Sequence, residues 1–238
     1  MDDELKNMIF KRKSSRNFTD DVITDSEIND LKNFIKKAKS LDSNIKTDCD
    51  ILTKSEVSVQ MPWKSPRYLA IYSDETPNYK VNIGFIYQQV DLYLQSKGFG
   101  SCWIGMGKPK NPRKDLKFVI LIGFGRSDKP IYRETNEFKR KSIDEITDSP
   151  SDELECARVA PSAVNSQPWY FKKNNGGYEV YSIKHNFIKS KLLGKWNPID
   201  MGIALAHLYI SNPDTFKFEF NKNCSELKGY ESLGILSF

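Results

Sequence analysis

The 238-residue sequence predicts an α+β protein, because helical and strand-like segments are mixed in it without a strict alternation of strand and helix. Two short apolar runs rich in β-branched and aromatic residues, 67–72 and 117–124, predict buried strands. Between them, residues 81–98 carry an apolar stripe at helical spacing, which predicts a helix of about four turns. The second half of the chain repeats this mixture.

The first half contains two predicted helices. Residues 25–40 place apolar side chains at helical spacing, with Asp25 or Ser26 available as the N-cap. The helix within 81–98 has Asn82 as its expected cap and Gly98 as its expected stop.

The second half contains four further predicted segments. Residues 150–160 predict a helix, and 169–183 predict a hairpin whose NNGG sequence supplies the positive φ angles of a tight turn. Residues 199–210 predict a second helix, and the strand-like runs at 216–220 and 231–238 follow it.

Two internal echoes suggest that the halves descend from a duplicated unit. The helix at 199–210 resembles the earlier one at an offset of 118, with Asp200 in the place of Asn82 and a glycine two residues later in both. The letters FKRKS also occur twice, at an offset of 128. Similar offsets indicate a unit of somewhat over a hundred residues, although five letters can coincide in a lysine-rich chain.

Composition points to an ordinary folded protein. The chain is 39% hydrophobic and 12% aromatic, and its net charge of +5 is spread over short basic clusters interleaved with acidic residues. The four cysteines are too far apart for a CxxC motif, and the longest apolar run, FVILIGFG, is too short to span a bilayer. No apolar leader follows the N-terminus. We therefore expect a cytoplasmic protein with reduced thiols and without a membrane or nucleic-acid partner.

Several common site motifs fail in this sequence. Gly107-Lys108 lacks the remainder of a P-loop, and GFGSCW and GFGRSD lack the last glycine of a dinucleotide fingerprint. Two histidines without nearby cysteine partners disfavour a zinc site, and no GxSxG sequence occurs. The sequence therefore predicts no metal site and no serine hydrolase.

Residues 12–16 concentrate donor side chains in a short segment. If this segment is extended, Arg12, Ser14 and Arg16 emerge on one side, with about 7 Å between neighbours. Two guanidinium groups and a hydroxyl match a terminal phosphate, since guanidinium binds phosphate bidentately at any working pH. A solvated basic strand is the alternative interpretation.

Residues 157–169, ARVAPSAVNSQPW, closely resemble the APSxxNxQPW signature of the nitroreductase family of FMN-dependent oxidoreductases. The RxSxR segment that starts at Arg12 resembles the N-terminal companion motif of that family. GFGSCWIGM at 98–106 and FKRKSIDEI at 138–146 are similar to two further family segments. In APSAVNSQPW the prolines favour a shaped loop, and Pro168 biases Gln167 toward extended geometry.

The resemblance implies a nitroreductase-like FMN-dependent fold and names residues for cofactor binding. Phosphate and ribityl contacts are implied for Arg12, Lys13, Ser14, Arg16 and Arg140. Contacts along the isoalloxazine ring are implied for Trp103, Ile104, Gly105 and Met106 on one side and for Pro161, Ser162 and Asn165 on the other. No catalytic side chain is assigned, because the flavin carries the chemistry and water can supply the proton.

The motifs are divided between the halves, which implies a fused pseudo-dimer. GFGSCW occurs only in the first half and APSxxNxQPW only in the second, while the corresponding AKSLDSNIKTD lacks both prolines and the tryptophan. We expect one intertwined unit built from halves 1–137 and 138–238, with central mixed sheets flanked by helices. One working site inside one chain implies a monomer.

The expected function is FMN-dependent reduction of a small electron acceptor, such as a nitroaromatic or a quinone, with NADH or NADPH as reductant and ping-pong kinetics. Two alternatives remain open at this point. The first is an FMN-binding protein without turnover, which the altered first-half loop favours. The second is a basic RNA-binding module, although the sequence has no RRM or KH signature.

Overall fold

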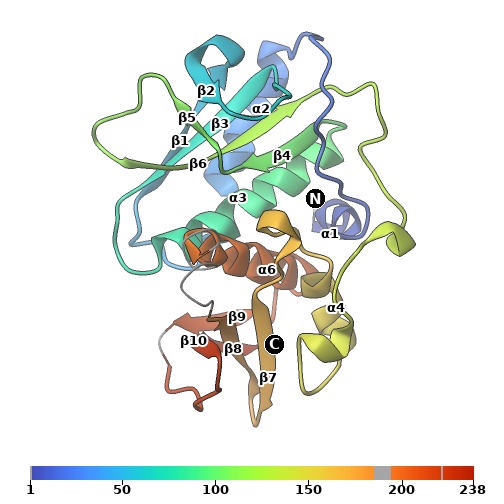
Figure 1. The fold of residues 1–238 in the computed structure, drawn as a ribbon, viewed down its shortest axis with the longest axis vertical. Coiled ribbons are helices and arrows are strands. Elements are labelled where there is room, and N and C mark those ends of the chain that lie inside the picture. Colours follow the sequence, from blue (N-terminus) through green and yellow to red (C-terminus); the bar gives the residue numbers. More distant parts are fainter. Residues whose placement is uncertain (1, 185–193, 221) are drawn as a thin grey trace.

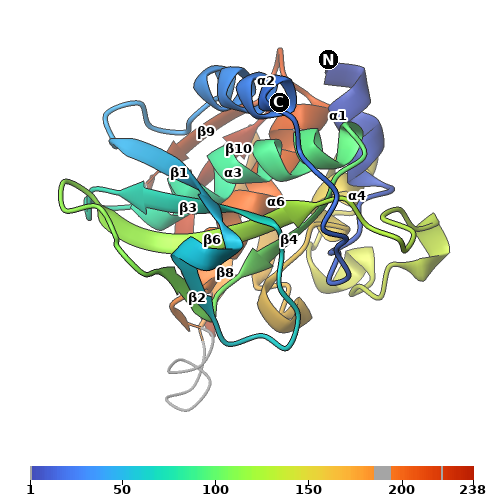
Figure 2. The same cartoon turned by 90° about the horizontal axis from the view of Figure 1, so that it is seen from above.

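The computed structural model describes residues 2–184, 194–220 and 222–238. Two four-stranded sheets lie on opposite sides of a central pair of helices, α3 (Tyr79–Ser96) and α6 (Asn197–Ser211) (Figure 1). This arrangement confirms the prediction of a mixed helix and sheet protein. Seen from above, the first sheet lies over the two central helices (Figure 2).

The first sheet has the order β1-β3-β6-β4 and the second the order β7-β8-β10-β9, all neighbours being antiparallel. A small two-stranded antiparallel sheet, β2-β5, covers part of the first sheet. The strands are β1 (Thr47–Thr53), β2 (Val57–Val59), β3 (Arg67–Ser73), β4 (Gly100–Ile104), β5 (Gly107–Pro109), β6 (Lys117–Gly125), β7 (Trp169–Asn174), β8 (Gly177–Ile183), β9 (Lys217–Phe220) and β10 (Tyr230–Ser237).

The two large sheets have the same internal order. Each consists of two successive strands, a central helix and two more strands, and in each the fourth strand lies between the second and the third. The correspondence pairs β1 with β7, β3 with β8, α3 with α6, β4 with β9 and β6 with β10.

The helices α3 and α6 cross at two glycines. A Cβ added to Gly84 would lie 2.0 Å from the carbonyl oxygen of Ile199, and one added to Gly202 would lie 1.9 Å from that of Val81. Only glycine allows the two backbones to approach so closely. The crossing lies at the centre of the main core, which contains side chains from both sheets and both helices.

Among the described residues, the shorter α-helices around this core are α1 (Asp2–Ile9), α2 (Asp25–Lys37) and α4 (Asp152–Arg158). The predicted cap of α2 was wrong by one residue, because Thr24 is the N-cap and forms a capping box with Glu27. The predicted cap of α3 was also wrong: Asn82 is buried inside the helix, and Asn78 precedes its first residue. Gly98 follows α3 with a φ of 77°, as the predicted stop requires.

The predicted strands are confirmed as β3, β6, β7, β8, β9 and β10. The described part of the chain contains no helix long and apolar enough to cross a membrane. Within the NNGG turn between β7 and β8, only Gly177 has a positive φ, at 152°. The four cysteines are free thiols.

Candidate active site

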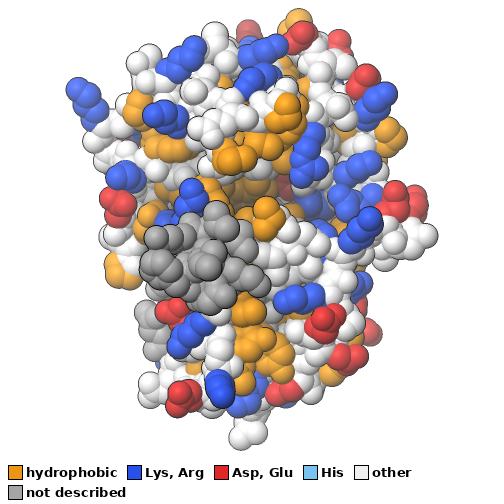
Figure 3. Space-filling model, in the orientation of Figure 1, with side chains coloured by type: hydrophobic (Ala, Val, Ile, Leu, Met, Phe, Trp, Pro, Cys, Tyr) orange, Lys and Arg blue, Asp and Glu red, His pale blue; other side chains and the backbone are white. Residues whose placement is uncertain are grey.

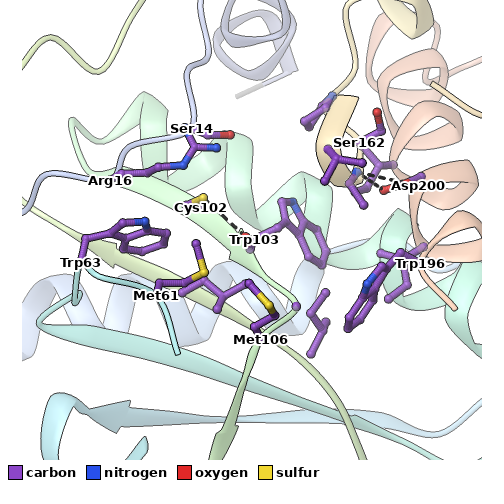
Figure 4. Close-up of a pocket in the computed structure, with 18 residues that line it drawn as sticks. Ser14, Arg16, Met61, Trp63, Cys102, Trp103, Met106, Ser162, Trp196 and Asp200 are labelled. Atoms are coloured by element: carbon purple, nitrogen blue, oxygen red, sulfur yellow. Dashed lines mark hydrogen bonds between the residues drawn. The ribbon is translucent and has the colours of Figure 1, made fainter. Parts of the chain in front are cut away.

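A cavity of about 590 Å³ brings three sequence-distant segments together. That volume lies within the usual range for a ligand pocket. Of the residues predicted to bind the cofactor, eight line this cavity: Ser14, Arg16, Trp103, Ile104, Gly105, Met106, Pro161 and Ser162. In Figure 4, Ser14 and Arg16 lie on one side, Ser162 and Asp200 on the other, and Trp103 between them.

The N-terminal segment is extended beside β4, as predicted. Ser14 pairs with Ser101 in a parallel bridge, and the Ser15 N–H donates to the Ser101 carbonyl at 2.9 Å. Ser15 points away from the cavity and packs on Gly100, where an added Cβ would lie 2.6 Å from its hydroxyl. Glycine at the start of β4 therefore lets this segment lie close enough to present Ser14 and Arg16 to the cavity.

Arg12 is buried and does not line the cavity. Its Nε donates to the Asp91 carboxylate at 3.1 Å, and its Nη2 donates to the Ser14 hydroxyl at 3.1 Å. The Asp91 oxygens also accept from Ser101 Oγ at 2.6 Å and from Gln88 and Gln95 amides. Arg12 thus orients Ser14 while its own charge is balanced by Asp91.

A group of cations lies behind Ser14 and Arg16. Burial, followed by the charges of Arg12, Arg133 and Arg158, lowers the pKa of Arg140 to about 10. Burial also lowers the pKa of Arg133, with Arg12 and Arg16 adding to the effect, and its buried Nε has no hydrogen-bond partner among the described residues. Figure 3 shows Lys and Arg side chains next to hydrophobic ones on the face of the molecule that Figure 1 views. Such mutually repelling cations would be stabilised by a bound anion such as phosphate.

The loop 159–168 forms the opposite wall in a conformation with several positive φ angles. Val164, Asn165 and Gln167 have φ values of 46°, 59° and 47°. The expectation of extended geometry at Gln167 was wrong, because Gln167 is held from several sides: its N–H donates to Ser162 Oγ at 2.9 Å, and its side chain bonds to Lys141 and Asn165 backbone atoms. Strained backbone of this kind gathers at functional sites.

Two predicted binding residues in or near this loop face each other outside the cavity lining. Arg140 donates to Asn165 Oδ1 at 2.7 Å and to the Ala160 carbonyl at 3.0 Å. Asn165 donates in turn to the Lys139 carbonyl at 2.8 Å. Lys13 is also outside the lining, and its N–H donates to Gln95 Oε1 at 2.9 Å. Cofactor contacts stay predictions for all of the predicted residues, both those that line the cavity and the four outside its lining, Arg12, Lys13, Arg140 and Asn165.

Trp103 lies at the centre of the site, and a series of hydrogen bonds connects its indole to the core. Its Nε1–H donates to Gln88 Oε1 at 3.1 Å. The two Gln88 amide hydrogens then serve Asp91 Oδ2 at 3.2 Å and His207 Nε2 at 3.1 Å, and His207 Nδ1 donates to the Cys156 carbonyl at 2.8 Å. This pattern makes His207 a neutral Nδ1–H tautomer, consistent with burial lowering its pKa to about 3.

Sequence reasoning did not foresee the apolar part of the cavity. It is formed by side chains for which no role was predicted: Met61, Trp63, Ile120, Val164, Trp196, Ile199 and Ile203. Trp196 packs on the flat backbone at Gly105, where an added Cβ would lie 2.6 Å from its ring. Cys102 also lines the cavity, and burial raises the pKa of its thiol, so it is not a thiolate nucleophile. Asp200, noted only as an echo of Asn82, completes the lining.

No group of three or more potential metal ligands is present among the described residues. The site combines Arg16 at the lining with further arginines behind it, a tryptophan-lined apolar cavity and a loop with positive φ angles. Arginine can bind an anion and apolar walls can enclose a ring system, so this arrangement would suit an organic anion with a large flat body.

Comparison with known proteins identifies the family of this chain. Residues 4–212 match the model of the family described as "Putative TM nitroreductase". The chain belongs to this nitroreductase family. Its fold resembles the crystal structure of a "putative nitroreductase" from Thermotoga maritima, with a TM-score of 0.60 and 23% identity over 87% of this chain and 82% of that one.

Two more distant structures are nitroreductases from Clostridium difficile R20291 and Desulfitobacterium hafniense DCB-2. The first, called FMN-dependent, is 19% identical with a TM-score of 0.46, covering 60% of this chain and 100% of that one. The second, with bound FMN, is 13% identical with a TM-score of 0.44, covering 58% and 98%. Among curated proteins, none matches the chain.

Proposed function

We propose that the chain is an FMN-dependent NAD(P)H oxidoreductase that reduces a small electron acceptor such as a quinone or a nitroaromatic compound. The observation that carries this proposal is the meeting of the RxSxR, GFGSCWIGM and APSxxNxQPW segments around one cavity, in a chain of the nitroreductase family. FMN-dependent and FMN-containing nitroreductases among the similar structures are consistent with it.

The residues present suit FMN in both charge and shape. Ser14 and Arg16, with Arg133 and Arg140 behind them, would hold the phosphate and ribityl chain. Burial and neighbouring arginines lower the pKa of Arg133 and of Arg140, so a bound anion would stabilise both charges. The walls at Trp103–Met106 and at Pro161 and Ser162 would enclose the flat ring system. When bound, FMN supplies the transfer of hydride between the nicotinamide and the acceptor.

The remaining contribution of the protein is positional. Gln88 fixes the Trp103 indole, and Asp91 fixes Arg12 and thereby Ser14, so the cavity walls are held from the core side. The apolar side chains around the cavity exclude water, which strengthens polar interactions inside it. A single cavity for both substrates implies that they bind in turn, giving ping-pong kinetics.

We also propose that the chain is a fused pseudo-dimer with halves 1–137 and 138–238. The identical strand order of the two sheets and the glycine crossing of α3 and α6 support this division. In this view Asn82 and Asp200 are equivalent, and the cavity takes its walls from both halves.

The test begins with the released cofactor of the purified, full-length protein. We expect chromatography to identify FMN, anaerobic NADH or NADPH to bleach the flavin absorbance, and a quinone or nitroarene to restore it. Double-reciprocal plots should be parallel. Intersecting lines would exclude the ping-pong mechanism, and bound flavin that neither nucleotide reduces would favour a flavin-binding protein without turnover.

A further inference from the structure

Asp200 is a buried carboxyl group in the wall of the cavity. It lies in the first turn of α6, is 3% exposed, and lines the cavity beside Ser162 and Ala163 (Figure 4). Its two oxygens share the Ala163 N–H at 3.0 and 3.1 Å, and Oδ2 also accepts from the Ser166 hydroxyl at 3.4 Å. The side chain therefore anchors the strained loop.

The corresponding residue in the first half, Asn82, also anchors a loop, and its side chain is uncharged. Asn82 stands two residues before Gly84, as Asp200 stands two before Gly202. Its Oδ1 accepts from the Leu41 and Asp42 N–H groups at 2.9 and 3.2 Å, and its Nδ2 donates to the Asp42 carbonyl at 3.2 Å. An amide thus suffices to anchor a loop at this helix position. Holding the loop does not by itself require a carboxyl group at position 200.

The hydrogen bonds of Asp200 suit a neutral acid better than a carboxylate. A carboxylate offers about four acceptor sites, yet only one N–H and one distant hydroxyl serve them here. No described cation is ion-paired with it, and a buried unpaired charge is costly. Burial raises the pKa of Asp200 to about 8, while the bonds from Ala163 and Ser166 act in the opposite direction.

The surrounding charged and titratable groups do not supply a direct counter-charge. Arg16 and Cys102 line the same cavity, and Arg140 contacts the loop at Asn165. His207, further along α6, is neutral, and Arg158 on α4 pairs with Glu155. None of these groups is hydrogen-bonded to Asp200 in the described structure.

We propose that Asp200 is a catalytic acid, which donates its carboxyl proton to an oxygen atom of the molecule reduced in this cavity. The inference rests on the proposed function and narrows its acceptors to those that gain a proton on oxygen, such as a quinone carbonyl. The acceptor takes two electrons and one proton as hydride from the reduced cofactor. It takes the second proton from Asp200, whose O–H bond breaks as the new O–H bond forms. Water then returns a proton to the carboxylate.

The substitution Asp200→Asn separates this proton from the anchoring of the loop, because an amide keeps the acceptor oxygen, as Asn82 shows. Flavin affinity and the rate of reduction by NADH or NADPH should stay within about twofold of wild type. Reoxidation by a quinone should slow at least about 100-fold, the lower range for general acid catalysis. Ferricyanide, which accepts an electron without a proton, should reoxidise both proteins at similar rates.

Equal slowing with ferricyanide and quinone would assign Asp200 a structural role and overturn the proposal. An unchanged quinone rate would overturn it as well. A solvent deuterium isotope effect on the quinone step that disappears in Asp200→Asn would support the proposal.

A second measurement uses the flavin-free, full-length chain and needs no turnover. Infrared difference spectra between wild type and Asp200→Asn at pH 6 should contain the band of a protonated carboxylic acid. A carboxylate band instead would overturn the proposal. If the infrared band is present but neither nucleotide reduces the flavin, the proposed oxidoreductase function fails and Asp200 has no substrate to protonate. That result differs from a carboxylate band, which would show that Asp200 is ionised.

Thermal unfolding provides a check on the same ionisation. A folded-state pKa above the unfolded value of about 3.9 means that the folded state holds its proton longer. Wild type should therefore lose stability relative to Asp200→Asn as pH rises from about 4 to about 8. A difference in melting temperature that is independent of pH would contradict the buried acid.

Discussion

Arg12 and Arg16 belong to the same N-terminal segment, yet Arg12 is paired with a buried carboxylate and Arg16 lines the cavity. Arg12 is 1% exposed and is tied to Asp91, so removing it would leave a buried carboxylate without its partner. That loss costs several kcal/mol of stability on its own. Arg16 is exposed and lines the cavity without an ion pair among the described residues. Arg16 is consequently the cleaner probe of phosphate binding.

Arg16→Ala should weaken FMN binding by roughly 1.5 to 3 kcal/mol, the range for a hydrogen bond to a charged group. Riboflavin, which lacks the phosphate, should bind both proteins with similar affinity. Isothermal titration of the flavin-free chain measures both ligands. Arg113→Ala is the matched control, because Arg113 pairs with surface carboxylates and does not line the cavity. An equal loss for FMN and riboflavin would show that Arg16 does not contact the phosphate.

His207 is the second residue whose charge state has a measurable consequence. It is fully buried, and its Nε2 can accept from Gln88 only while that nitrogen is unprotonated. Burial lowers the pKa to about 3 from the usual 6.5. Between about pH 3 and pH 6.5, His207 is therefore protonated in the unfolded chain and neutral in the folded chain.

We expect the chain to lose stability through this group as the pH falls from about 6.5 toward 3, by at most about 1.4 kcal/mol per pH unit. His207→Gln should remove this part of the acid sensitivity, because glutamine does not titrate. Urea unfolding of the two proteins at several pH values measures the difference. Parallel stability curves for the two proteins would mean that His207 is not held neutral.

At the scale of elements, the apolar pattern predicted the two central helices and the strands β3, β6, β9 and β10. Burial decides α3, α6, β3 and β6, whereas β9 contributes only partly buried side chains to the core. Prediction failed where a local and a tertiary partner competed. Asn82 has the side chain of a cap, yet it lies buried inside α3 and anchors residues 41 and 42. The strand β1, TDCDILT, has few apolar residues and is defined by its pairing with β3.

The crossing of α3 and α6 gives an element-scale prediction. Gly84→Ala and Gly202→Ala should each destabilise the chain by about 1 to 3 kcal/mol or more, because the added Cβ meets backbone atoms, which cannot move aside like a flexible side chain. Gly176→Ala is the control, since nothing lies within 4 Å of its Cβ position. Denaturant unfolding compares the three. A stability close to wild type for either crossing variant would show that the helices can separate without cost.

At the scale of the whole molecule, the motifs predicted part of the lining of the candidate site and missed the rest. Short motif strings predicted Ser14, Arg16 and Ser162 because those positions depend on local sequence around them. Trp63 and Trp196 could not be found in this way, since they come from segments without a motif and reach the cavity only through the tertiary fold. For Asp200, the sequence showed only the match with Asn82. Its proposed role as an acid could be inferred only from the burial and the hydrogen bonds of the two residues in the structure.

The distribution of the site over both halves determines the expected stoichiometry. Ser14, Arg16 and Trp103 come from the first half of the sequence and Ser162 and Asp200 from the second, so residues of a single chain enclose this cavity. In the first half, the loop at 41–42 is anchored by Asn82 but lacks the prolines and tryptophan of its counterpart.

We therefore expect one FMN per chain and a monomer at micromolar concentration. Released flavin measured against protein gives the ratio, and light scattering coupled to gel filtration gives the mass of the same sample. Arg16→Ala run in parallel should lower the flavin ratio after dialysis while leaving the mass unchanged, because Arg16 is an exposed residue of the cavity. Two FMN per chain would require a second site in the first half. A flavin-dependent dimer would mean that a partner chain completes the site, and either result would contradict a site formed within one chain.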